Sequence, residues 1–80
     1  MTRAEILAGV AEVARLHLGH AEPLEERQRL IEDLGLDSLR RLVLAAEVEN
    51  RFRVALGPED EARIATVGDL ATVVAEKLRR

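Results

Sequence analysis

Three helix-start signals divide the sequence and restrict it to a helical fold. Thr2 is followed three residues later by Glu5, which is the spacing of a capping box that satisfies free backbone N–H groups. Thr66 and Asp69 repeat this spacing, with Asp in place of the usual Glu or Gln. Asp37 is a third N-cap residue ahead of an apolar, periodic segment. The three signals predict three main helices.

Apolar residues at helical spacing follow each signal and set the lengths of these helices. The first helix is predicted to end near Leu18, because Gly19 suits a left-handed cap. The second is predicted over residues 37–52 and the last from residue 66 to about residue 78. Pro58 is tolerated in a first turn, so it opens a short helix that we expect to end around residues 63–64.

Composition agrees with an all-α fold. The apolar residues are mostly Leu, Val and Ala, which form helices readily, and Phe52 is the only aromatic residue. With 80 residues and no cysteine, the chain has to rely on efficient packing in place of disulfides, and we expect residues 1–80 to form a single domain. The predicted architecture has three main helices, one short helix and a long first loop.

The long loop, residues 19–36, carries no sustained helical pattern. A segment of this length is uncommon in a small domain unless it is functional or contains a short element, so we expect one helical turn within residues 23–31. Five apolar residues could pin the loop across the bundle as an ordered strap: Leu24, Leu30, Ile31, Leu34 and Leu36.

The second predicted helix has two apolar faces. One is interpreted as the core face and consists of Leu42, Ala45, Val48 and Phe52. The other lies about a third to half a turn away and consists of Leu39, Val43 and Ala46. Only one face can pack in the core, so the other needs a partner or a covering element.

Charge and hydropathy argue against two classes of partner. The net charge is −3 and there is no aromatic platform, so we expect no nucleic-acid partner. The first residues lack the apolar region of a signal peptide, and no apolar run approaches the ~20 residues that span a bilayer. We therefore expect a cytoplasmic, monomeric protein that has no membrane partner.

Ser38 is the strongest candidate for a chemically functional residue. It directly follows the predicted cap Asp37, at the positive end of a helix and among N–H groups without intrahelical partners. A phosphate attached there would be electrostatically favoured. Asp37 also offers a carboxylate that could help to hold a metal ion during modification. These residues alone are equally compatible with an ordinary capped helix start.

Residues 35–39, Gly-Leu-Asp-Ser-Leu, resemble the phosphopantetheine-attachment motif of acyl carrier proteins. The resemblance covers nearly the whole chain, including the apolar first loop, Glu-Asn-Arg-Phe at residues 49–52, the acidic residues 59–61 and the Thr-Val-Gly-Asp-Leu start of the last helix. It implies a four-helix acyl-carrier-like bundle. It also implies that a phosphopantetheinyl transferase attaches 4′-phosphopantetheine to Ser38 with the help of magnesium, and that the thiol of this arm holds acyl groups as thioesters.

The resemblance further implies that the protein is a carrier and not an enzyme, and that acyl-loading and acyl-processing enzymes dock on the second helix. The predicted partner surface consists of Leu39, Arg40, Arg41, Val43, Ala46 and Glu47. Residues 37–53 depart from the acidic pattern of many fatty-acid carriers, because four arginines and three acidic residues give them a net charge of +1. Arg40 and Arg41 therefore suggest enzymes with an acidic docking surface. Alternatively, they are solvated, or pair with Glu32 and Asp33 or with the phosphate of the arm.

Other interpretations remain open or are poorly supported. An aminoacyl, peptidyl or D-alanyl carrier, or an unmodified helical interaction module, is an alternative to a fatty-acid, polyketide or specialised-metabolite carrier. His17, His20 and Glu22 straddle a helix end without a fourth ligand, so we expect no metal site. A Ser-His-Asp hydrolase is also unsupported, because Asp37 adjoins Ser38 and cannot orient a histidine for it.

Overall fold

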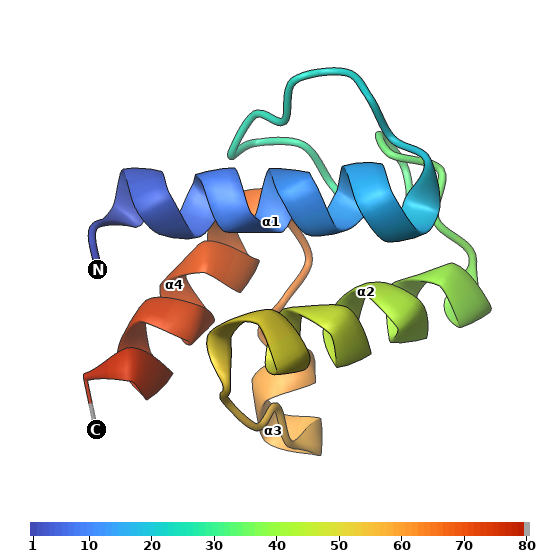
Figure 1. The fold of residues 1–80 in the computed structure, drawn as a ribbon. Coiled ribbons are helices and arrows are strands. Elements are labelled where there is room, and N and C mark those ends of the chain that lie inside the picture. Colours follow the sequence, from blue (N-terminus) through green and yellow to red (C-terminus); the bar gives the residue numbers. More distant parts are fainter. Residues whose placement is uncertain (80) are drawn as a thin grey trace.

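The computed structural model describes residues 1–79, and these form an α-helical bundle (Figure 1). The four helices of the described residues are α1 (Arg3–Leu18), α2 (Ser38–Phe52), α3 (Pro58–Glu61) and α4 (Val67–Leu78). In Figure 1 the long loop after α1 runs back over that helix before α2 begins. The predicted fold class is confirmed, with three main helices, one short helix and a long first loop.

The predicted caps define where the main helices begin. Thr2 and Thr66 each complete a capping box, in which the threonine hydroxyl accepts from the N–H of Glu5 or Asp69 and that carboxylate accepts from the N–H of the threonine. Gly19 ends α1 with φ 68°, in the left-handed region that glycine adopts without strain. These helix boundaries follow from local chemistry, as predicted.

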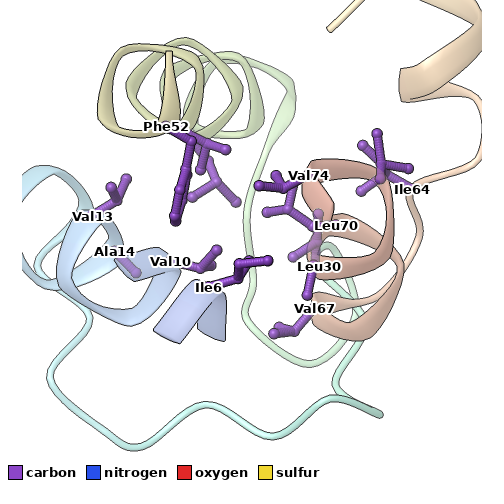
Figure 2. Packing of buried hydrophobic residues seen from close by; sticks show 14 of the residues in the cluster. Ile6, Val10, Val13, Ala14, Leu30, Phe52, Ile64, Val67, Leu70 and Val74 are labelled. Atoms are coloured by element: carbon purple, nitrogen blue, oxygen red, sulfur yellow. The ribbon is translucent and has the colours of Figure 1, made fainter. Parts of the chain in front are cut away.

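The core lies where α1 packs on α2 and α4 (Figure 2). In Figure 2 Phe52 points from α2 towards α1, and Leu70 and Val74 reach the same interior from α4. Gly9 of α1 lies against the ring of Phe52 on α2, since an added Cβ atom at Gly9 would lie 2.5 Å from Cζ of Phe52. The buried apolar residues are Ile6, Val10, Val13, Ala14, Leu18, Leu30, Leu36, Leu44, Val48, Phe52, Ile64, Val67, Leu70, Ala71, Val73 and Val74.

The first loop is an ordered strap, but it differs in detail from the prediction. Leu30 and Leu36 are buried, whereas Ile31 is half exposed. Backbone bonds tie the loop to the start of α4: the N–H of Leu30 donates to Ala65, and the N–H of Val67 donates to Gln28. In place of the helical turn expected within residues 23–31, a single turn forms at residues 25–28, closed by the bond from the Gln28 N–H to the Glu25 carbonyl. Consecutive turns also occupy residues 30–34, where bonds such as that from the Asp33 N–H to the Arg29 carbonyl close them.

The predicted core face of α2 is confirmed at Val48 and Phe52 but is wrong at Leu42. Leu42 is 60% exposed, while Leu44, which was predicted on neither face, is 3% exposed. Leu44, Val48 and Phe52 recur every four residues and form one continuous buried stripe. Leu42 lies about a third of a turn away from Val48, so it turns out of the interface with α1. Ala45 is only partly buried.

The short α3 ends at Glu61, two to three residues before its predicted end, and a turn at residues 62–63 leads to Ile64. The carboxylate of Asp60, which is 8% exposed, pairs with Nζ of Lys77 on α4 at 2.7 Å. The Lys77 ammonium and the backbone N–H of Gly57 hold the pKa of the Asp60 carboxyl below its ordinary range. This ion pair anchors α3 against α4. In residues 1–79 no helix is both long enough and apolar enough to cross a bilayer.

Candidate functional site

Ser38 is the first residue of α2 and is exposed. Asp37 caps the helix, since its Oδ1 accepts from the N–H of Arg40 at 2.8 Å and its carbonyl accepts from the N–H of Arg41 at 2.9 Å. The cap fixes the direction in which α2 leaves the loop. Ser38 therefore lies at a rigid helix start with its side chain open to solvent.

The start of α2 has unsatisfied donors. Asp37 accepts from the backbone N–H groups of Arg40 and Arg41. The backbone N–H groups of Ser38 and Leu39 have no acceptor within residues 1–79. Free N–H groups and the positive end of the helix dipole together favour an anion at this position. A phosphate linked to the Ser38 hydroxyl would lie beside both donors.

The hydroxyl of Ser38 differs from the other hydroxyls of the chain. Ser38 is the only serine, there is no tyrosine, and the remaining hydroxyls belong to Thr2, Thr66 and Thr72. Thr2 and Thr66 serve as caps, and Oγ1 of Thr72 accepts from the guanidinium of Arg3 at 3.1 Å. Within the described part of the chain, Ser38 alone has a hydroxyl without a hydrogen-bond partner. It is the hydroxyl most open to modification.

The two arginines after Leu39 bind backbone carbonyls. Nη2 of Arg40 donates to the carbonyl of Leu18, at the end of α1, at 2.7 Å. Nη2 of Arg41 donates to the carbonyls of Glu61 at 3.2 Å and Ile64 at 2.5 Å. Of the alternatives raised from the sequence, pairing of Arg40 and Arg41 with Glu32 and Asp33 is wrong, whereas Arg40 remains exposed to solvent. Arg29 makes the ion pairs with Glu32 and Asp33 instead.

The exposed apolar face of α2 has a different composition from the predicted one. Leu39 is 69% exposed and Ala46 is exposed, as expected, and Leu42 joins them. Val43 is partly buried and packs against the core, so it contributes less to this face than predicted. Glu47 lies 3.5 Å from Nε2 of His17, which places its carboxylate against α1. Leu39, Leu42 and Ala46 form what we call the outer face of α2.

A groove of about 520 Å³ opens next to Ser38. Its apolar lining comes from the loop, the outer face of α2 and the short helix region, and the complete lining is Ile31, Ser38, Arg41, Leu42, Pro58, Glu61 and Ala62. By contrast, two smaller hollows that reach buried core residues measure about 10 Å³ each, room for roughly one water molecule. A flexible group attached to Ser38 would meet the groove first.

The histidines are separate from this site. His17 faces Glu47, and Nε2 of His20 is buried without a hydrogen-bond partner. Among residues 1–79 no three acidic or histidine side chains gather in a way that could hold a metal ion.

Comparison with known proteins identifies the family. The profile of the family described as "Phosphopantetheine attachment site" matches residues 4–74, which include the whole of the site. An acyl carrier protein of Thermotoga maritima is 36% identical over 78 residues, covering 96% of each chain. The chain belongs to the acyl carrier protein family. Members of this family bear a covalently attached 4′-phosphopantetheine, and the free hydroxyl and N–H groups at the start of α2 fit such a group.

Two further acyl carrier proteins extend the comparison. The meromycolate extension acyl carrier protein of Mycobacterium leprae is 36% identical over 76 residues, which cover 92% of this chain but 65% of that protein. The chain thus spans less than two thirds of that relative. A solved structure from Mycobacterium tuberculosis, assigned to the acyl carrier proteins, is 34% identical with a TM-score of 0.71 and covers 92% of this chain and 95% of its own. Sequence and fold therefore agree on the family.

Proposed function

We propose that Ser38 is the residue that carries the 4′-phosphopantetheine arm. The observation that carries this proposal is the free Ser38 hydroxyl at the start of α2, with two free N–H groups beside it. The other hydroxyls are held in capping boxes or by Arg3. When bound, the arm supplies a thiol that holds acyl groups as thioesters.

The chain's own residues support the attachment reaction in distinct ways. The Ser38 hydroxyl is the nucleophile: its oxygen bonds to a phosphorus of the coenzyme A pyrophosphate, adenosine 3′,5′-bisphosphate leaves, and the hydroxyl proton passes to the transferase. Asp37 holds the helix start rigid and retains one carboxylate oxygen that makes no capping bond, which could help to bind the magnesium ion of the reaction. After transfer, the N–H groups of Ser38 and Leu39 stabilise the phosphodiester charge.

We further propose that the protein is a non-catalytic monomeric carrier, and its cytoplasmic location remains a prediction. Acyl carriers serve biosynthetic enzymes and a phosphopantetheinyl transferase. The outer face of α2 supports docking of these enzymes beside the arm, because Leu39 and Leu42 are large apolar residues without a covering element. Arg40 and Arg41 form part of the same surface, but their bonds to carbonyls leave less of their charge free for a partner. A fatty-acid, polyketide or specialised-metabolite cargo is favoured over an aminoacyl cargo by the Asp-Ser-Leu motif.

Intact-mass spectrometry tests the attachment. Incubation with coenzyme A, magnesium and a broad-specificity transferase is expected to add the mass of one phosphopantetheinyl group. Ser38→Ala should abolish the gain, while Thr72→Ala, which removes another surface hydroxyl, should leave it intact. An unchanged mass with several transferases would contradict the proposal and favour the unmodified interaction module.

A further inference from the structure

Arg41 ties α2 to the turn that follows α3. Its guanidinium donates to two carbonyls on that turn, those of Glu61 and Ile64, which lie 20 and 23 residues away in sequence. The side chain is partly buried. Hydrogen bonds from a charged donor are among the stronger ones in proteins, particularly where water is partly excluded. Arg41 therefore fixes the position of this turn against α2.

Arg41 also lines two hollows of different size. It borders the groove beside Ser38, and it borders a smaller hollow of about 10 Å³. Among residues 1–79, Glu61 is the one other residue that lines both hollows, and its carbonyl is one of the two that Arg41 binds. The smaller hollow is otherwise apolar, lined by Leu30, Leu44, Ala45, Leu56, Ile64 and Leu70. A chain that moved from the groove into the smaller hollow would have to displace the Arg41 guanidinium.

We propose that Arg41 is a latch that holds α2 closed against the turn after α3 and keeps acyl cargo outside the core. This inference rests on the proposed attachment at Ser38. Entry of a chain would break two charge-assisted bonds and leave a partly buried guanidinium unpaired. Cargo then lies in the groove, against Ile31, Leu42 and Ala62. The class of cargo that fits is an acyl group that does not require burial, either short or polar.

The latch can be tested first in the unmodified protein. Arg41→Met removes the donors at nearly constant side-chain length, and Arg40→Met is the matched control, because Arg40 binds the Leu18 carbonyl and borders neither the groove nor the smaller hollow. Native-state amide hydrogen exchange should become about tenfold faster or more over residues 57–66 in Arg41→Met. It should stay unchanged there in the control. Equal exchange in the two variants would overturn the latch.

The loaded protein supplies the second test. Butanoyl, octanoyl and dodecanoyl forms, checked by intact mass, are cleaved with hydroxylamine. The unsubstituted protein should show one cleavage rate for all three chains. In Arg41→Met the cleavage rate should fall with chain length. Each methylene that enters the core shifts the equilibrium of the acyl chain between the groove and the core by about fourfold towards the core. A fall with chain length in the unsubstituted protein would refute the latch.

Failure of the latch and failure of the proposed function are distinguishable. A protein that gains no mass contradicts attachment at Ser38, whereas the exchange experiment needs no arm. Circular dichroism verifies that Arg41→Met is folded. If it is not, Arg41→Lys, which retains the charge and fewer donors, replaces it in both experiments, with a smaller acceleration of exchange expected in the same segment.

Discussion

Replacing Leu44 and Leu42 by alanine, one at a time, probes the orientation of α2. The two substitutions are chemically identical and lie two residues apart on one helix. Leu44 is 3% exposed and borders both smaller hollows, so its truncation leaves a cavity in the core and should cost about 2–5 kcal/mol. Leu42 is 60% exposed, so less than half of its transfer free energy is lost and the cost should be about 1 kcal/mol or less.

These free energies predict clearly different thermal midpoints. For a domain of this size, a loss of 1 kcal/mol in the free energy of unfolding lowers Tm by about 4–8 °C. Leu44→Ala should therefore lower Tm by about 8–40 °C and Leu42→Ala by less than about 8 °C. The total free energy of unfolding expected for 80 residues is about 4–12 kcal/mol, so Leu44→Ala could remove much of it.

Far-ultraviolet circular dichroism is the appropriate probe, because the chain has no Trp or Tyr whose fluorescence could report unfolding. Urea titration of both variants and the unsubstituted protein gives the free energies, and constant slopes would show that only stability has changed. Equal destabilisation by the two substitutions, or a larger effect at Leu42, would refute the orientation of α2 described above. It would restore the face that contains Leu42 and Ala45 as the core face.

Two further predictions concern stability. Gly9→Val should destabilise the protein by about 1–3 kcal/mol in urea titration, because the new side chain overlaps the Phe52 ring. Ala8→Val, on the exposed side of α1, should cost about 0.5 kcal/mol. Equal effects of the two substitutions would contradict the contact between Gly9 and the Phe52 ring. The pKa of Asp60 is lower in the folded protein than in the unfolded chain. Its carboxylate therefore contributes fully to the free energy of unfolding at a pH above the ordinary carboxyl pKa, and this contribution is lost as the pH falls through the folded-state pKa. The urea concentration at the unfolding midpoint should therefore decrease when the pH is lowered below about 4. Lys77→Met should make this decrease smaller. A urea midpoint that stays constant down to about pH 2.5 would contradict the role of the ion pair.

The features that could be predicted from the sequence are those fixed by local chemistry. Thr2, Thr66 and Asp37 cap their helices through side chains that bond backbone groups three residues away. Gly19 ends α1 in the left-handed conformation, which glycine adopts without strain. Because such bonds depend on neighbours along the chain, they can be inferred without knowing how the helices pack.

The features that were missed depend on tertiary packing. The two apolar stripes of α2 overlap around the helix, and only the position of α1 decides that Leu44 and not Leu42 faces inwards. A stripe with a period of four residues, Leu44, Val48 and Phe52, was the signal that could have revealed it. The bonds of Arg40 and Arg41 join groups about 20 residues apart, and no local pattern specifies them. A charge count alone therefore overstated how freely these arginines meet a partner.

The position of the phosphodiester is the most direct test of the central claim, that the free hydroxyl at the start of α2 carries the arm. The modified protein is digested, and fragment ions of its peptides are used to distinguish Ser38 from Thr2, Thr66 and Thr72. The structure predicts that the phosphopantetheinyl mass lies on Ser38 alone, because each threonine hydroxyl is already bonded. Modification of any threonine, or of none of the four hydroxyls, would contradict it.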